Sequence, residues 1–312
     1  MVHARNLDEF SIDSSACVVA IGVFDALHRG HLKVIESAKE LASKLDAKVY
    51  VLTFFPHPSK VLSKEKKSQL IYGLDTRLKL LWSLGVDCIF VKDFTADFAA
   101  LSPDEFLLYI MRKFPNLKGI VTGDNFRFGK NAGADTDWLA AKSEDFGFKS
   151  IAVKGEIDDD MYVSSTRLRR LLGEGRMEEF ARLCSRPYFA MGKVVPGKHL
   201  GAKLGFPTLN LNLSGECLPP FGVYVSRLEN LDTGISYKGV SNYGNCPSVG
   251  GGVAAVLETN LFSDSINFGK GTPIKVELLK FLRGERKFPN LDELKNQINI
   301  DKNEALAYFS CL

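Results

Sequence analysis

Two histidines three residues apart, His28 and His31, lie where a predicted strand turns into a predicted helix. Residues 16–23 form a continuous apolar run, typical of a strand buried on both faces, and residues 31–45 carry apolar side chains at helical spacing. Free N–H groups at a helix start favour phosphate, and two imidazoles there could neutralise charge developing on a phosphate during attack. The alternative is that both are surface or capping residues. Three of the five histidines fall between residues 28 and 57, and two share this turn, which favours the chemical interpretation.

Glycines flank this histidine pair. Gly22 would let a nucleotide approach the end of the strand closely, and Gly30 permits the turn into the helix. In an α/β sheet, a crevice at the carboxyl ends of the strands is the expected ligand site.

Three later segments follow predicted strands at the same edge. His57 lies in a loop between two prolines, and Gly-Asp-Asn-Phe-Arg-Phe-Gly spans residues 123–129. Val-Ser-Ser-Thr-Arg-Leu-Arg at residues 163–169 begins a helix, which its hydroxyls can cap and from which Arg169 can reach a phosphate. The hydroxyls could equally be only a helix cap.

A second group of polar residues follows a glycine-rich segment at residues 197–205. Thr208 and Asn210 alternate on one strand face after Pro207, and they offer oxygen ligands of the kind that Mg²⁺ takes beside phosphate oxygens. The glycines can bring N–H groups to phosphates. A glycine-rich loop with a hairpin turn is the alternative, and the spacing leaves both open.

A carboxylate and a charged segment follow in the same half. Glu258 closes an apolar strand at residues 253–257, either as an exposed strand end or as a general base beside a nucleotide. Residues 283–288 could be a solvated turn. Alternatively, Arg283 and Phe288 could close over a planar aromatic ligand.

The elements that must position these residues differ between two halves of the chain. Strands and helices alternate up to about residue 186, which predicts a doubly wound, parallel α/β domain over residues 1–186. Residues 1–186 contain 12 glycines, whereas the following 126 residues contain 15. Short alternating strands with Gly/Pro turns there predict a small closed β-barrel over residues 187–312. Two C-terminal helices are expected, at residues 291–298 and 304–309.

Composition excludes several classes of protein. Hydrophobic residues make 45% of the chain, which excludes wholesale disorder, and 40 basic against 37 acidic residues exclude a basic nucleic-acid-binding body. The six cysteines form no CxxC pair, so neither a zinc site nor a disulfide framework is indicated, and a reducing cytoplasm is expected. No apolar run reaches the roughly 18 residues that span a membrane, and the N-terminus has no signal-peptide core.

The first half resembles a known family. G-x-F-D-x-x-H-x-G-H at residues 22–31 is the signature of the nucleotidylyl transferase superfamily. Together with FxPHP at 54–58, GDNFRFG and VSSTRLR, it is similar to the adenylyltransferase module of bacterial bifunctional riboflavin kinase/FAD synthetases. Ala26 stands where that family usually has Gly. The resemblance implies catalytic roles for His28, His31 and Arg169, nucleotide binding by Gly22, Phe24, Asp25, Gly30, Ser164, Ser165 and Thr166, and flavin binding by His57, Asn125 and Arg127.

The second half resembles riboflavin kinase. GFPTxN at 205–210, GVSNYGNCPS at 239–248 and FLRGERKF at 281–288 occur in the family's order. Departures are Asn260 where His is common, Ser248 in place of Thr, and Asn-Phe-Gly at 267–269 where Leu-Tyr-Gly is usual. The resemblance implies a catalytic Glu258, Mg²⁺ and nucleotide contacts by Thr208 and Asn210, further nucleotide contacts by Gly197 and Lys203, and flavin contacts by Arg283, Arg286 and Phe288.

Two reactions are implied, with ATP and Mg²⁺ and with riboflavin and FMN as substrates. The kinase transfers the γ-phosphoryl group of ATP to riboflavin, and the transferase then joins FMN to the AMP part of a second ATP. One alternative is that a single module is active and the other only binds or oligomerises. Another is a regulatory barrel that binds nucleic acid, against which the balanced charge argues. No nucleic-acid or membrane partner is expected, and the oligomeric state is not specified by the sequence.

Overall fold

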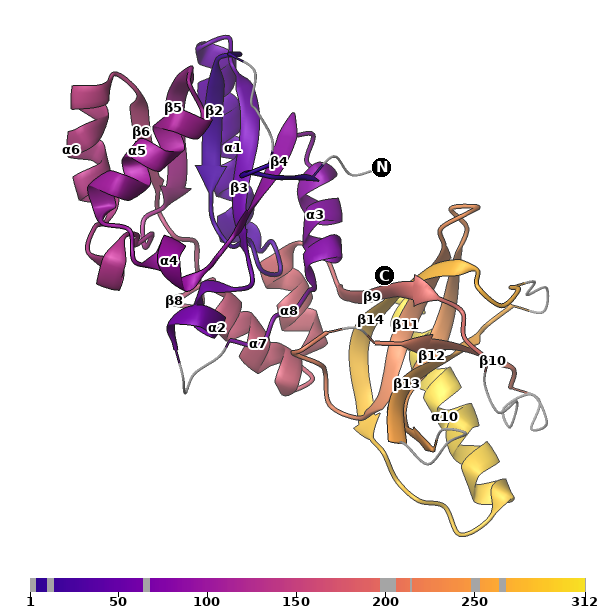
Figure 1. Cartoon of the computed structure of the whole chain (residues 1–312). Helices are drawn as coiled ribbons and strands as arrows, with labels where there is room; N and C mark the ends of the chain where they lie inside the picture. Colours follow the sequence, from indigo (N-terminus) through magenta and orange to yellow (C-terminus); the bar gives the residue numbers. More distant parts are fainter. Residues whose placement is uncertain are drawn as a thin grey trace. The chain divides into compact units, whose positions relative to one another are not determined.

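The computed structural model describes residues 4–9, 14–63, 68–196, 206–213, 215–247, 253–263 and 268–311. The chain forms two compact units, Met1–Arg167 and Leu168–Leu312 (Figure 1). Each unit has its own sheet and its own core. A functional boundary near residue 186 stays a prediction.

The first unit contains a six-stranded parallel sheet in the order β1-β4-β3-β2-β5-β6. Its strands are β1 (Ala4–Asn6), β2 (Cys17–Ile21), β3 (Lys48–Phe55), β4 (Cys88–Asp93), β5 (Leu117–Gly123) and β6 (Lys149–Val153). The central strand β2 is buried at every position, as its continuous apolar run predicts.

Helices cover both faces of this sheet (Figure 1). Side chains that alternate along β2 enter two separate cores: Val18 and Ala20 pack with α1 (Arg29–Lys44) and α3 (Leu74–Trp82). Val19 and Ile21 pack with α4 (Ala96–Ala99), α5 (Pro103–Lys113) and α6 (Thr136–Phe146). The doubly wound α/β prediction is therefore confirmed.

Several short elements lack a pattern long enough to be read from the sequence. They are β1, the five-residue helix α2 (Pro58–Leu62), α4, a 3₁₀ turn at Lys130–Ala132, and the hairpin of β7 (Ile157–Asp158) and β8 (Met161–Tyr162). Periodicity needs several residues to emerge, so elements of two to five residues depend on tertiary contacts.

The second unit begins within α7 (Ser165–Gly173), continues through α8 (Met177–Cys184) and then forms a six-stranded antiparallel sheet. The strand order is β10-β13-β12-β11-β14-β9, and an antiparallel bridge between Val195 and Asn210 joins the two ends of the curled sheet. The predicted barrel-like antiparallel fold is confirmed in the form of a curled half-barrel. The strands are β9 (Tyr188–Lys193), β10 (Thr208–Asn212), β11 (Gly222–Asn230), β12 (Ser236–Pro247), β13 (Val253–Leu261) and β14 (Pro273–Gly284).

One C-terminal helix, α10 (Leu291–Ser310), replaces the two that were expected. Residues 299–303 contain neither Gly nor Pro, so nothing in the backbone chemistry interrupts the helix between the two apolar stretches. Asp301, in the middle of the presumed gap, is buried against the barrel. Ala305 and Phe309 pack on Val225 and Leu279 of the sheet.

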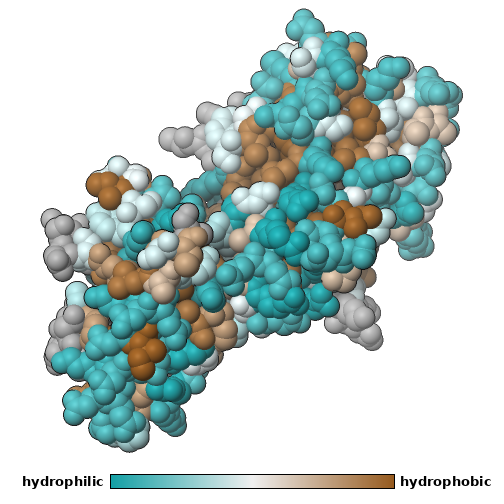
Figure 2. Space-filling model, turned by 180° about the vertical axis from the view of Figure 1, so that it is seen from behind, coloured by the Kyte–Doolittle hydropathy of each residue, from teal (hydrophilic) through white to brown (hydrophobic). Residues whose placement is uncertain are grey.

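Hydrophobic and hydrophilic residues are interspersed over the face seen in Figure 2. Scattered exposed apolar side chains are normal for a globular protein. Among the described residues, no helix is both long enough and apolar enough to cross a membrane.

Candidate active sites

The histidine pair lies at the start of α1, directly after β2. His28 is the N-cap of the helix, and its Nδ1 accepts a hydrogen bond from the backbone N–H of His31 at 3.4 Å. The two imidazoles stack with ring centroids 3.8 Å apart and planes 18° apart. His28 is therefore a capping residue, and the same geometry brings both rings together at the carboxyl edge of the sheet, where a phosphate site is expected.

The loop between β2 and α1 has a strained backbone. Phe24, Ala26 and Leu27 have φ angles of 55°, 62° and 48°, in the left-handed region that costs a non-glycine residue about 1–2 kcal/mol. Ala26 is the position at which the resembling family usually has Gly, and the φ angle supplies the physical reason. The loop keeps this shape because its side chains are anchored.

Asp25 is one of those anchors. It is buried, and its carboxylate accepts hydrogen bonds from the backbone N–H groups of Ile71 and Tyr72 at 3.2–3.3 Å. Its carbonyl oxygen accepts a hydrogen bond from Ser165 Oγ at 3.1 Å. Asp25 thus joins three segments, and nucleotide binding by its side chain stays a prediction.

The two glycines of the motif make room for its own side chains. A Cβ at Gly22 would lie 3.0 Å from the Phe24 ring, and a Cβ at Gly30 would lie 3.2 Å from the His28 ring. The Phe24 ring in turn contacts His31 edge-on, with centroids 5.3 Å apart. Direct contact of Gly22, Gly30 and Phe24 with a nucleotide stays a prediction.

Two residues that the sequence interpretation missed also hold this loop. Arg77 Nη1 and Thr53 Oγ1 both donate hydrogen bonds to the carbonyl oxygen of Val23, at 2.6 and 3.1 Å. No sequence signal marks either residue, because Arg77 lies in an ordinary amphipathic helix and Thr53 lies in a buried strand.

The hydroxyls of the VSSTRLR segment have structural partners. Ser164 Oγ accepts a hydrogen bond from the Arg167 N–H at 3.2 Å, so the capping interpretation is correct for Ser164. Ser165 reaches Asp25, whereas Thr166 is exposed. Arg169 belongs to the second compact unit, and its role in adenylyl transfer stays a prediction.

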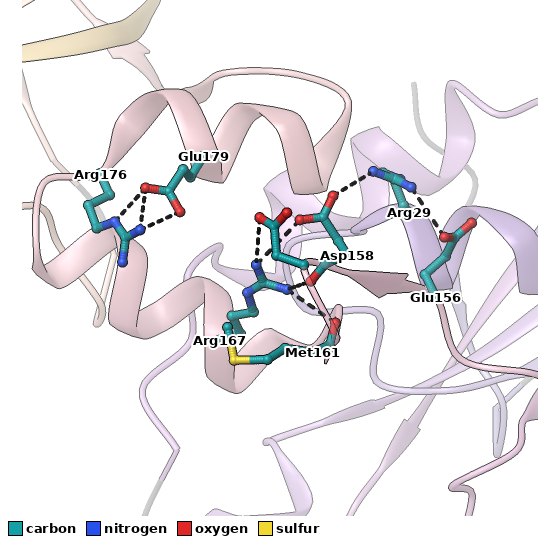
Figure 3. Close-up of polar contacts among 8 residues, drawn as sticks. Arg29, Glu156, Asp158, Met161, Arg167, Arg176 and Glu179 are labelled. Carbon is teal, nitrogen blue, oxygen red and sulfur yellow. Dashed lines mark hydrogen bonds and ion pairs between the residues drawn. The ribbon is translucent and has the colours of Figure 1, made fainter.

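A network of ion pairs fixes the β7–β8 hairpin beside the starts of α1 and α7 (Figure 3). Arg29 pairs with Glu156 and Asp158 at 3.2 and 3.4 Å. Arg167 donates to the carbonyl oxygens of Asp158 and Met161 at 2.7 and 3.2 Å. A hydrogen bond from Lys33, together with the nearby Arg29 charge, lowers the pKa of Glu156.

The predicted flavin-binding residues of the first unit lie in two loops. Asn125 and Arg127 are exposed after β5, and Arg127 pairs with Asp135 at 3.5 Å. His57 is the N-cap of α2, where its Nδ1 accepts from the Ser59 N–H at 3.1 Å. Flavin binding by these three residues stays a prediction.

In the barrel, strand register brings the second group of residues together. Asn210 on β10 lies directly opposite Glu258 on β13, and Glu258 lies opposite Asn242 on β12. Directly opposite residues point to the same face of a sheet, so the three side chains form one polar row. Thr208 lies two residues before Asn210, on the same face and opposite Asn260.

Glu258 is not at a strand end. Strand β13 continues to Leu261, and Glu258 is half-buried within it. The interpretation of Glu258 as an exposed strand end is therefore wrong. The same cross-sheet row continues through Val223 to Arg283 on β14.

Arg283 and Arg286 are held by buried residues of α10. Arg283 forms two hydrogen bonds with the Asp301 carboxylate, at 2.9 and 2.7 Å, and Arg286 donates to Gln297. Gln297 also donates to Asp301 at 2.8 Å. The two guanidinium carbons lie 5.9 and 4.8 Å from the centroid of the Phe288 ring. The solvated-turn interpretation is wrong for Arg283. Asp301 was missed because it lies between the two expected helices, and Gln297 because nothing in the helical pattern of residues 291–298 distinguishes it.

The remaining predicted contacts cannot be placed in this geometry. Gly197 and Lys203, like Ser248 and Asn267, lie outside the described residues. Asn260 donates from Nδ2 to the carbonyl oxygen of Pro207 at 2.8 Å. Among the described residues, no group of three or more His, Cys, Asp or Glu side chains could hold a metal ion.

Comparisons with known proteins match both halves. The family described as FAD synthetase matches residues 11–167, and that described as riboflavin kinase matches residues 184–309. The bifunctional riboflavin kinase/FMN adenylyltransferase of Bacillus subtilis (strain 168) is 36% identical over 307 residues, with 96% of this chain and 95% of the relative covered. That of Escherichia coli (strain K12) is 33% identical over 293 residues, covering 94% and 93%.

A solved structure extends the likeness to the fold. A crystal structure titled as a macrolide-efflux protein from Streptococcus pneumoniae has a TM-score of 0.84 and 28% identity, covering 96% of this chain and 97% of that chain. The two family matches follow one another in the order of the two units, and the relatives are similar along nearly their whole length. The chain therefore belongs to the family of bifunctional riboflavin kinase/FMN adenylyltransferases.

Proposed function

We propose that this riboflavin kinase and FMN adenylyltransferase carries out its two reactions at two separate sites, with ATP donating its γ-phosphoryl group in one and its adenylyl group in the other. Adenylyl transfer is assigned to the domain of residues 1–186 and riboflavin phosphorylation to the domain of residues 187–312. The observation that carries this division is the pair of polar constellations in two different sheets: the stacked histidines after β2 and the Asn210–Glu258 pair in the barrel.

In adenylyl transfer, a phosphate oxygen of FMN attacks the α-phosphorus of ATP, and the bond to the departing pyrophosphate breaks. The phosphate of FMN is ionised near neutral pH, so no covalent enzyme intermediate is needed. His28 and His31 stabilise the charge on the transferring group, together with the N–H groups at the start of α1. Arg169 supplies a further positive charge to a phosphate.

In the kinase reaction, Glu258 accepts the proton of the riboflavin 5′-hydroxyl while that oxygen attacks the γ-phosphorus of ATP, and the bond from the γ-phosphorus to the departing ADP breaks. Positioning and electrostatic stabilisation dominate such transfers. Arg283, held by Asp301, presents a fixed guanidinium beside Phe288 and is assigned to the flavin together with Arg286.

The oxygen donors of the barrel row suit Mg²⁺. Mg²⁺ prefers oxygen ligands, takes one or two from the protein and leaves the rest to phosphates and water. Thr208 and Asn210 lie two residues apart on one face of β10 and supply one hydroxyl and one amide oxygen. When bound with ATP, Mg²⁺ would offset phosphate charge, and Thr208 and Asn210 would hold it.

The test measures the two half-reactions separately on one preparation of purified protein. With both histidines replaced, as in His28→Ala/His31→Ala, FAD formation from FMN should fall by about 10²-fold or more, by analogy with the loss of one oxyanion donor. Riboflavin phosphorylation should persist. With Glu258→Gln, phosphorylation should fall about 10²–10⁴-fold, the contribution of a general base, while FAD formation persists. A variant that loses both reactions has misfolded. Unchanged FAD formation in the histidine variant would remove the histidines from the adenylyl site, and unchanged phosphorylation in Glu258→Gln would remove Glu258 as the general base.

A further inference from the structure

The conformation of the loop at residues 22–28 needs external support. Three of its non-glycine residues, Phe24, Ala26 and Leu27, have positive φ angles. Such angles persist only where the surrounding structure determines them several times over. The groups that hold the loop are therefore candidates for a role in the reaction that it serves.

A guanidinium lies beneath this loop. Arg77 of α3 is 1% exposed, and its Nη1 donates to the carbonyl oxygen of Val23 at 2.6 Å. Arginine is almost never buried so fully unless it is paired, and hydrogen bonds from charged donors are roughly twice as strong as those between neutral groups. Thr53 Oγ1 donates to the same oxygen at 3.1 Å, so this one carbonyl is fixed from two directions.

The segment at residues 71–77, which contains Arg77, also contacts the loop at Asp25. The N–H groups of Ile71 and Tyr72 donate to the Asp25 carboxylate. Residues 71–77 thus hold Val23 by its carbonyl group and Asp25 by its carboxylate. Phe24 lies between these two residues in the chain, and its ring meets the ring of His31.

We propose that Arg77 is a positioning residue for adenylyl transfer. By fixing the Val23 carbonyl, it sets the place of Phe24 and, through that ring, the place of the His31 imidazole beside His28. Arg77 acts through the loop and is not itself a catalytic residue. The inference rests on the proposed assignment of the adenylyl step to the two histidines.

A purely structural role makes a different prediction. If Arg77 only stabilised α3, its replacement would lower the melting temperature and leave the turnover of folded molecules unchanged. Leu81→Ala provides the matched control, because Leu81 is fully buried one turn further along the same helix but has an apolar side chain that donates no hydrogen bond to the loop. The kinase activity of the same chain reports the amount of protein in each assay, and thermal unfolding reports whether the first unit is folded.

The experiment compares Arg77→Met, Arg77→Lys and Leu81→Ala in the full chain, well below their melting temperatures. Arg77→Met keeps much of the side-chain length but has no donor, so kcat for FAD formation should fall about 10²-fold, the effect of an ångström-scale misplacement. KM for ATP and for FMN should change much less, and riboflavin phosphorylation should be unaffected. Arg77→Lys, which keeps a charged donor, should recover part of the loss. Leu81→Ala should lower the melting temperature but not kcat.

Two results would overturn the proposal: a normal adenylyl kcat in Arg77→Met, or an equal loss of kcat in Leu81→Ala. If Arg77→Met does not fold, Thr53→Val removes the other donor to Val23 with little change of volume. Its adenylyl kcat should fall several-fold, and an unchanged kcat would again count against positioning. A parallel assay of His28→Ala distinguishes failure of the histidine-site assignment from failure of the proposed role of Arg77. Normal FAD formation there defeats the site assignment, whereas loss there with an unaffected Arg77→Met defeats only the role of Arg77.

Discussion

At the scale of single residues, the loop of the proposed adenylyl-transfer site has a strained backbone. The loop at residues 22–28 gives His28 its capping position, yet it requires left-handed angles at residues that carry side chains. Since such angles are unfavourable for any residue with a Cβ, the fold stabilises this loop at a local cost. Ala26 is the position at which that cost can be measured most directly.

Ala26→Gly should leave the free energy of unfolding unchanged or raise it. Relief of the angle at Ala26 gains about 1–2 kcal/mol, which offsets the entropy of a glycine and the loss of one buried methyl group, each about 0.5–1 kcal/mol. The control is Ala38→Gly, equally buried but within α1, which should lower the free energy of unfolding by about 1 kcal/mol or more. Denaturant unfolding of both variants checks this, and equal destabilisation would contradict it.

At the scale of elements, helix α10 holds the two arginines that are assigned to the proposed kinase site. Its buried Asp301 and Gln297 hold Arg283 and Arg286, which lie at the end of β14 and in the segment that follows. A buried ion pair contributes specificity of geometry, and removal of one partner is costly because the other charge stays behind.

Asp301→Asn should therefore impair both stability and use of riboflavin. We expect a loss on the order of 3 kcal/mol in the free energy of unfolding, and a several-fold rise in KM for riboflavin with a smaller change in KM for ATP. Asp292→Asn, an exposed acid in the first turn of the same helix, is the control and should change neither KM. Equal KM values in Asp301→Asn and the native protein would remove Arg283 from the flavin site.

The β7–β8 hairpin should make the stability of the first unit depend on pH in acid. Because Lys33 and Arg29 lower the pKa of Glu156 in the folded protein, its contribution is present above the unfolded pKa of about 4.3 and is lost as the pH falls through the lower, folded pKa. Glu156→Gln should thus melt at a lower temperature than the native protein at pH 7, and the difference should shrink below about pH 4. A difference that is constant with pH would show that Glu156 acts through packing rather than through charge.

At the scale of the whole molecule, the two units should be separable, and the place of the cut matters. Helix α8 packs on the barrel: the ring of Phe180 meets that of Tyr188, and Gly175 lies beside Phe281. A fragment of residues 168–312 keeps these contacts, whereas one that begins at 185 loses them.

We expect the fragment of residues 168–312 to fold and to phosphorylate riboflavin without making FAD. The fragment of residues 185–312 should have the same specificity and a lower melting temperature, because it exposes the face that α8 covers. Chromatographic separation of flavins and thermal unfolding test both statements. A folded longer fragment without kinase activity would show that the kinase site needs residues from the first unit.

The sequence by itself determined the fold class and supplied the candidate site residues. The apolar run of β2, the helical spacing of α1 and the change in glycine content each reflect local physics, because burial on two faces, helix periodicity and turn formation act over a few residues. The histidine turn could be found in this way, since two histidines were gathered where one pattern ends and the next begins. The pattern left the role of Glu258 open, and the family resemblance supplied it.

Only the tertiary structure decided which residues meet. Asn210 and Glu258 are 48 positions apart and became neighbours through strand register, which depends on pairing across the whole barrel. Arg77 reaches Val23, and Asp301 reaches Arg283, across packed elements that no local pattern connects. Long-range hydrogen bonds leave no periodic trace in the chain, so the chemistry of these buried charges becomes visible only once the elements are packed together.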